Sequence, residues 1–317
     1  MPQLAEMLFA PLHPGAGGQR WLAYHAPAQG APLGLVLHVH AFAEEMNKSR
    51  RMVSRQARLL AEAGYAVLLL DLLGCGDSDG DFGDATWPAW IDDVVAAAAW
   101  LRRRHASLPK PAPNPAAPPP LWLWGHRAGC LLVAEAARRI PDVGGLLLWQ
   151  PLLNGAQQLQ QFLRLGRVGG LLDGQRKVAA GAVGLADPLR AELAAGRPVE
   201  LAGYVLSPAL ADGLAQALLA PPEATAAPEA PQAPKSPRPA GQALWFEVSP
   251  RAEGQASAAQ QAGAARWREA GWQVDLQRVM GPAFWQTTEI EDADALLPAT
   301  LQAMLRGSGL ATAAAPA

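Results

Sequence analysis

Short apolar runs alternate with segments of helical periodicity along most of the chain. Seven runs predict β-strands: 20–25, 34–40, 65–71, 121–125, 145–150, 243–249 and 272–279. The run 67–70 is apolar without a break, which is typical of a strand buried on both faces of a sheet. Strands separated by helices predict a mostly parallel sheet flanked by helices, so the expected fold class is α/β. The run 20–25 is expected to pair at the edge of this sheet.

Helix-starting and helix-ending residues predict three helices between these strands. The predicted helices span 47–64, 88–100 and 126–140. Asn47 is a good N-cap residue, and Pro88 is favoured in the first turn of a helix. A basic cluster lies on the first helix and is interpreted as a solvated face; its members are Lys48, Arg50, Arg51, Arg55 and Arg58.

The remaining segments differ from the core in composition. Two are rich in proline and alanine and predict flexible surface connections. Another shows helical periodicity with little strand signal, which predicts a helical lid inserted into the core. The predicted units are a core at 1–151 and 242–306, a lid at 152–219, flexible segments at 107–120 and 220–241, and a disordered tail at 307–317.

Composition and charge exclude several classes of protein. Half of the 317 residues are hydrophobic, and the net charge of −2 gives no reason to expect nucleic acid as a partner. The two cysteines, Cys75 and Cys130, are too far apart for a CxxC motif, so no metal site or disulfide is predicted. We expect no cofactor, no membrane span and, without a signal peptide, a cytoplasmic location. The oligomeric state stays open.

A glycine-rich turn follows the predicted strand 65–71. It reads Asp-Leu-Leu-Gly-Cys-Gly-Asp-Ser at 71–78. No glycine stands three residues after Gly76, so the dinucleotide-binding pattern is not met. Phe82 occupies the position where a calcium loop needs glycine. The turn is therefore interpreted as structural.

A second turn has the sequence context of a nucleophile elbow. Residues 125–129 read Gly-His-Arg-Ala-Gly between a predicted strand and a predicted helix, as in the motif G-x-S-x-G. Arg127 stands where the nucleophilic serine belongs. Its guanidinium stays protonated and has no free lone pair, so it cannot be acylated.

The other two positions of a serine triad are also unsuitable. In this arrangement the order along the chain is nucleophile, acid, histidine, but none of the six histidines follows His126. The loop expected to carry the acid offers Ser249, Arg251 and Glu253 but no aspartate. The sequence therefore predicts a degenerate catalytic triad.

The run 38–48 falls where such folds build an oxyanion hole from backbone N–H groups. Glu44 and Glu45 lie near a predicted helix N-terminus, where the helix dipole favours negative charge by ~0.3–1 kcal/mol. Arg127 lies near another N-terminus and needs an anionic partner. We hypothesise that Arg127 pairs with Glu44 or Glu45; the alternative is that it points to solvent.

Several other side chains have two possible roles. One of His38 and His40 is expected to approach the cleft. Phe284 and Trp285 either line a ligand pocket or pack in the core. The cysteines are interpreted as small buried hydrophobes.

Three segments resemble the exosortase-A-system-associated hydrolases, specifically the second of their two types. They read Phe-Ala-Glu-Glu-Met-Asn-Lys-Ser-Arg-Arg-Met at 42–52, Asp-Leu-Leu-Gly-Cys-Gly-Asp-Ser-Asp-Gly-Asp-Phe at 71–82 and Gly-Pro-Ala-Phe-Trp-Gln-Thr-Thr-Glu at 281–289. The resemblance implies an α/β-hydrolase-superfamily protein encoded beside bacterial machinery for protein sorting and exopolysaccharide synthesis. It draws attention to Glu44, Glu45 and Asn47 in the first segment.

Two functions follow from these observations. The first is a hydrolase of an acyl or glycan-linked small substrate that uses Glu44 or Glu45 as a general base and Arg127 to hold charge. The second is a catalytically silent protein that binds an anionic small molecule through Arg127. The expected ligand-binding side chains are Phe42, Asn47, His126 and Trp285.

Overall fold

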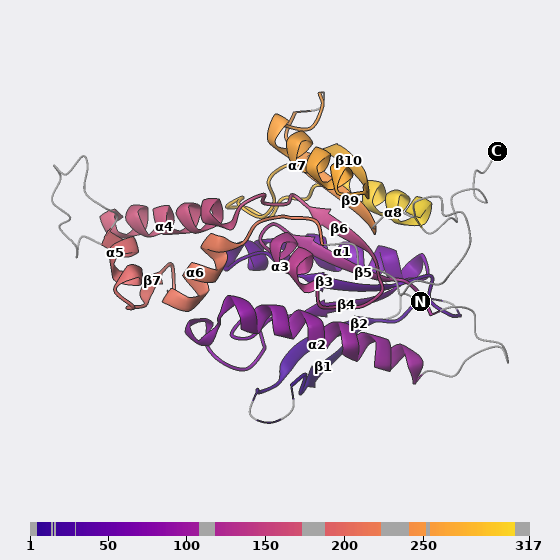
Figure 1. Ribbon diagram of the computed structural model, residues 1–317, viewed down its shortest axis with the longest axis horizontal. Helices are drawn as coiled ribbons and strands as arrows, with labels where there is room; N and C mark the ends of the chain where they lie inside the picture. Colours follow the sequence, from indigo (N-terminus) through magenta and orange to yellow (C-terminus); the bar gives the residue numbers. More distant parts are fainter. Residues whose placement is uncertain are drawn as a thin grey trace.

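A computed structural model describes residues 5–13, 15, 17–28, 30–107, 118–172, 188–222, 241–251 and 254–307. An eight-stranded sheet of order β1-β2-β4-β3-β5-β6-β9-β10 runs through its centre (Figure 1). The strands are β1 (Glu6–Ala10), β2 (Arg20–His25), β3 (Leu35–Val39), β4 (Ala66–Leu70), β5 (Leu121–His126), β6 (Val143–Trp149), β9 (Gly241–Ser249) and β10 (Trp272–Met280). From β4 to β10 all neighbours are parallel, which confirms the predicted α/β fold class.

The edge of the sheet differs from the prediction. Strand β2 is not an edge strand, because it pairs antiparallel with β4 on one side and with β1 on the other. Strand β1 was not predicted. Its residues 7–10 are apolar without alternation, and Met7 and Phe9 are exposed.

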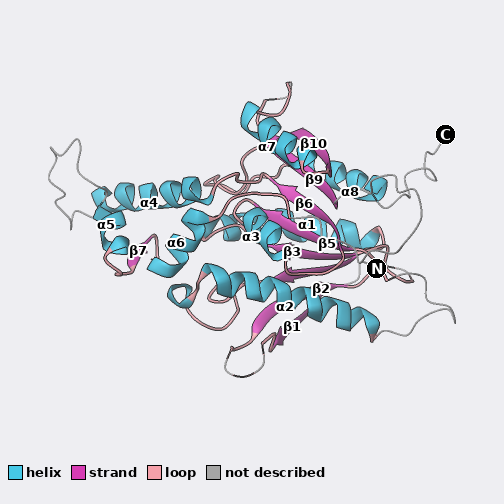
Figure 2. Cartoon of the chain, in the orientation of Figure 1, coloured by secondary structure: helices cyan, strands magenta, loops and turns pink. Residues whose placement is uncertain are grey.

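Helices cover both faces of the sheet (Figure 2). Those of the core are α1 (Glu44–Glu62), α2 (Trp87–Ala106), α3 (Gly129–Ala136), α7 (Ala258–Glu269) and α8 (Leu296–Gly307), with a short 3₁₀ helix η1 (Phe82–Asp84). Side chains of α1 and α8, such as Met52 and Met304, pack in one hydrophobic cluster. Side chains of α2, α3 and α7, such as Trp90 and Trp267, pack in the other. The sheet therefore separates two cores.

The predicted start of α1 at Asn47 is wrong. The helix begins at Glu44, and its N-cap is Ala43, with φ 51° and ψ −128°. Glu44 and Glu45 fill the first turn, where the helix dipole favours acidic side chains. The basic cluster of this helix is also more than a solvated face, because Arg51 and Arg55 both pair with Asp292.

An insertion joins β6 to β9 and extends from one end of the sheet (Figure 1). Its elements are α4 (Gly155–Leu172), α5 (Pro188–Ala194), β7 (Val199–Leu201), β8 (Tyr204–Leu206) and α6 (Pro208–Gln216). The small hairpin β7–β8 was not predicted. A lid function for this insertion remains a prediction, and the segments 107–120, 220–241 and 307–317 lie largely outside the described residues.

No helix within the described ranges combines the length and apolar character that crossing a bilayer requires.

Candidate functional site at the strand β5 elbow

Arg127 occupies a sharp turn between β5 and α3. Its φ is +55°, a left-handed conformation that a non-glycine residue adopts only where the surrounding structure imposes it. The flanking glycines make this turn possible. A Cβ atom on Gly125 would lie 2.6 Å from the Cα of Cys130, and one on Gly129 would meet the backbone oxygen of Val39. The strand–turn–helix context predicted for the elbow is therefore present.

The guanidinium of Arg127 is bound by three side chains. Its Nη2 donates to Glu45 Oε1 at 3.0 Å, and its Nε donates to Glu45 Oε2 at 3.3 Å. Nη2 also donates to Gln158 Oε1 at 3.2 Å and to Gln161 Oε1 at 3.3 Å. Arg127 is only 6% exposed, and its guanidinium lies 5.4 Å from the ring centre of Trp285. The predicted ion pair is confirmed with Glu45, and the solvent-facing alternative is wrong.

The topology of the sheet explains this pair. Strands β3 and β5 are parallel neighbours, with Val39 opposite Gly125, so the loops that follow them meet at one edge. Glu45 then lies at the N-terminus of α1, where its charge is stabilised, whereas Arg127 lies near the N-terminus of α3, where a cation is disfavoured. The ion pair compensates for that unfavourable position.

Glu44 and Asn47 form a separate contact with the insertion. Tyr204 Oη donates to Glu44 Oε2 at 3.2 Å, and Asn47 Nδ2 donates both to Tyr204 Oη at 3.1 Å and to Glu44 Oε2 at 3.2 Å. Burial, followed by the negative charge of Glu44, raises the pKa of Tyr204 to about 12. Glu44 and Asn47 thus bind Tyr204 of the insertion at the start of α1 and do not contact Arg127.

The remaining predicted ligand-binding residues are buried among aromatic rings. Phe42 packs edge-on against Phe162 of α4, with ring centres 5.2 Å apart. His126 stacks on Phe284 at 5.2 Å and meets Trp285 edge-on at 5.8 Å. Of the two roles considered for Phe284 and Trp285, core packing matches their burial, although Trp285 also covers Arg127. Their ligand-binding roles stay predictions.

The structure also places the loops where an acid and a histidine would be sought. After β10, Phe284 and Trp285 fill the space beside His126. After β9, Ser249 Oγ accepts a hydrogen bond from Arg278 at 2.7 Å, and Glu253 lies outside the described residues. Within the described part of the chain, no group of His, Cys, Asp and Glu side chains is arranged to hold a metal ion.

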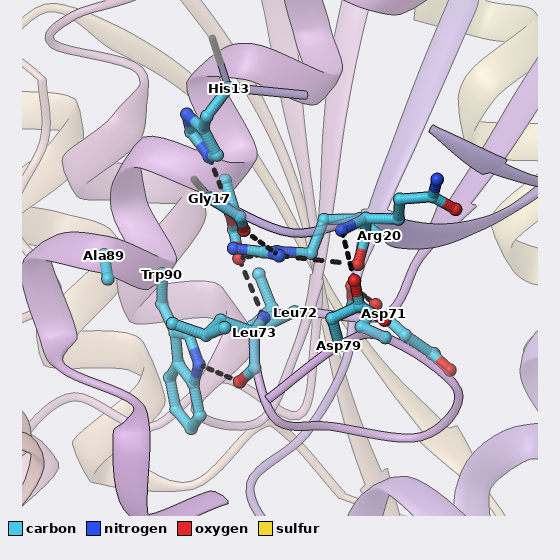
Figure 3. Close-up of polar contacts among 12 residues, drawn as sticks. His13, Gly17, Arg20, Asp71, Leu72, Leu73, Asp79, Ala89 and Trp90 are labelled. Carbon is cyan, nitrogen blue, oxygen red and sulfur yellow. Dashed lines mark hydrogen bonds and ion pairs between the residues drawn. The ribbon is translucent and has the colours of Figure 1, made fainter. Parts of the chain in front are cut away.

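Sequence reasoning missed three polar side chains of this site, Gln158, Gln161 and Tyr204. The amphipathic pattern of α4 indicated a helix but not the surface on which it docks. Sequence reasoning also missed a buried network beside the turn at 71–78, in which Asp93 binds Arg20 and His13 (Figure 3).

Comparison with known proteins identifies the family. The family Hydrolase_4, described as serine aminopeptidase, S33, matches residues 30–202, which is more than half of the chain. The chain belongs to this family. The matched range contains Glu45, Arg127 and most of the insertion.

Curated relatives of this S33-family chain match over shorter segments. An uncharacterized protein of Rickettsia prowazekii is 30% identical over 129 residues, which is 41% of this chain and 49% of that protein. The lysophosphatidylserine lipase ABHD12 of Danio rerio is 26% identical over 38% of this chain and 28% of its own length. The chain therefore matches less than half of the length of either relative.

Solved structures match over nearly the whole chain. Est1E from Butyrivibrio proteoclasticus with bound ferulic acid has a TM-score of 0.57 at 14% identity, covering 95% of this chain and 99% of that one. A thermostable carboxyl esterase from Bacillus coagulans has a TM-score of 0.55 at 14% identity, covering 88% and 91%. At such low identity these matches show the α/β-hydrolase fold and nothing finer.

Proposed function

We propose that this S33-family protein binds an anionic small molecule through Arg127 and forms no acyl-enzyme. The observation that carries the proposal is the two-point contact between the Arg127 guanidinium and the Glu45 carboxylate. An arginine fork matches a carboxylate or phosphate in this geometry. Glu45 is then an internal occupant of a carboxylate site, and an incoming anion takes its place at Arg127.

The insertion supports this role. Gln158 and Gln161 reach Arg127 from α4, while Tyr204 of β8 reaches Glu44 at the start of α1. Replacing Glu45 by a ligand at Arg127 therefore affects both the insertion and the first turn of α1. We propose that the insertion acts as a lid over this ligand. From the resemblance at 42–52, 71–82 and 281–289, we also propose that the protein works beside protein-sorting and exopolysaccharide machinery, in the cytoplasm.

A fluorophosphonate probe, which labels activated serines, is expected to leave the protein unlabelled. The Arg127→Ser variant is also expected to stay unlabelled, because no histidine follows the elbow to activate a new hydroxyl. Intact-protein mass spectrometry measures both, with a known serine esterase as the positive control. Stoichiometric labelling of any hydroxyl in the native protein would refute the degenerate triad.

Anion binding is expected to strengthen when the internal carboxylate is removed. Glu45→Gln should bind acetate or inorganic phosphate at least ten-fold more tightly than the native protein, because the anion no longer competes with Glu45 for Arg127. Titration calorimetry with each anion measures this. The double variant Glu45→Gln/Arg127→Gln is the control and should bind neither anion. Equal binding by the single and double variants would remove Arg127 from the site.

Because the chain belongs to a hydrolase family, we also consider a second function, that of a hydrolase without a standard triad. In that case Glu44 or Glu45 would act as a general base on water. Both oxygens of Glu45 face the Arg127 guanidinium, which leaves them poorly placed to accept a proton from water. Turnover of acyl esters that disappears in Glu44→Gln or Glu45→Gln would favour this candidate, and turnover that survives both changes would exclude these glutamates.

A further inference from the structure

A cavity lies between α1 and the central sheet. Its volume is about 520 Å³, within the range of ligand pockets, roughly 300–1,000 Å³. Residues of five neighbouring strands line it, from Met7 on β1, through Ala23 on β2 and Leu69 on β4, to His38 on β3 and His126 on β5. Because neighbouring strands are ~4.8 Å apart, this slot crosses roughly 19 Å of sheet.

The two ends of the slot differ in accessibility. At the β1 end, Met7 is 70% exposed and Arg58 of α1 is also exposed. At the β5 end, His38 and His126 are buried, at 3% and 0% exposed. His40 also lines this slot, while the prediction that one of His38 and His40 approaches the cleft at the elbow stays a prediction. A ligand would enter from the side of β1 and α1.

The buried end carries polar atoms that are unpaired among the described residues. His38 Nε2 and both ring nitrogens of His126 make no hydrogen bond there. Buried polar groups in native proteins are almost always satisfied, so a hydrogen-bonding group in the slot would be stabilised by these nitrogens. Burial, more than the neighbouring positive charge, holds the pKa of both imidazoles well below the usual value, so both are neutral near pH 7.

The charged side chain of the slot that lies on α1 near these histidines, Arg50, is already neutralised by an ion pair. Arg50 Nη2 is paired with Asp71 Oδ2 at 3.0 Å. The walls between the ends are largely apolar, with Ala23, Val53 and Leu69 among them. A carboxylate head group would lack a counter-ion at the buried end, and a pure hydrocarbon would leave the imidazole nitrogens unpaired. A neutral hydroxyl can pair with one ring nitrogen of each histidine and needs no counter-ion.

We propose that this slot binds a neutral amphipathic alcohol, with its linear apolar chain along the sheet and its hydroxyl group at His38 and His126. This site is separate from the anion site at Arg127 and does not depend on it. Arg127 does not line the slot, and the two sites recognise opposite chemistries.

Titration calorimetry with 1-octanol and with octanoate tests the proposal on the full-length protein. We expect 1-octanol to bind with one-to-one stoichiometry and octanoate to bind at least ten-fold more weakly. His38→Phe keeps a ring but removes the nitrogens, so it should weaken 1-octanol binding about ten-fold. His105→Phe, on α2 and away from the slot, is the matched control and should not change the affinity.

Steric variants test the position of the ligand. Ala23→Leu places a larger side chain on β2, next to the open end of the slot, and should abolish 1-octanol binding. If this variant does not fold, Ser54→Leu blocks the slot from α1, where Ser54 is half-buried. Absence of 1-octanol binding to the native protein, equal affinity for octanoate, or binding that survives both His38→Phe and a folded blocking variant would overturn the proposal. The double variant Glu45→Gln/Arg127→Gln should still bind 1-octanol, which separates this result from that of the anion site.

Discussion

Arg127→Met is expected to lower the free energy of unfolding by about 3–5 kcal/mol, the usual effect of breaking a buried ion pair by removing one partner. The side chains of Arg127 and Glu45 are 7% and 13% exposed, so the carboxylate left behind is poorly solvated. Gln158 and Gln161 lose the same hydrogen-bond donor. Urea denaturation of the variant and the native protein measures the change.

Removing the second charge should recover most of this loss. In Glu45→Gln/Arg127→Met no charge is buried at the elbow, and replacing a whole buried pair is often neutral or stabilising. The matched control is Arg139→Met, which breaks the half-exposed pair with Asp92; an exposed pair contributes ~0–1 kcal/mol. If Arg127→Met costs no more than Arg139→Met, the elbow pair is not the buried interaction that its geometry indicates.

The Arg127–Glu45 pair shows how far the sequence alone could predict the site. Glycines around Arg127 predicted a tight turn after a buried strand. Because neighbouring strands were expected to be parallel, the partner of Arg127 was expected in the segment that follows the adjacent strand. Because a cation near a helix N-terminus is unfavourable, Arg127 was expected to need an anionic partner. Only two nearby side chains, Glu44 and Glu45, could provide one. The sequence could not separate Glu44 from Glu45, because that choice depends on where α1 begins. The helix starts at Glu44, three residues before the cap predicted at Asn47.

Contacts between distant segments were beyond the sequence. Gln158 binds Arg127 and Tyr204 binds Glu44 only because the insertion packs back against the core, and no local sequence pattern predicts that packing. The strands were easier, because continuous apolar runs mark positions buried on both faces. Strand β1 is an exception, because its residues 7–10 are all apolar although Met7 and Phe9 are exposed on an edge. Patterns of burial were thus predictable, while the pairing of polar groups far apart in the sequence was not.

Asp93→Asn is expected to be at least as destabilising as Arg127→Met. Asp93 is fully buried; its Oδ2 accepts from Arg20 Nε at 2.9 Å and from Leu73 N at 2.8 Å, and its Oδ1 lies 2.8 Å from His13 Nε2. The substitution keeps the shape but leaves the guanidinium of Arg20, 3% exposed, without a counter-ion, at a cost of about 3–5 kcal/mol.

This loss should affect the whole fold, because the Asp93 network joins three segments. Arg20 begins β2, Leu73 lies in the turn after β4, and Asp93 belongs to α2. Urea denaturation followed by tryptophan fluorescence and by circular dichroism should therefore show one transition, shifted equally for both signals. The neighbouring Asp92→Asn is the control, since Asp92 is half-exposed and should change stability by ~0–1 kcal/mol. An Asp93→Asn variant as stable as Asp92→Asn would mean that Arg20 finds other compensation, and the network would not hold these segments together.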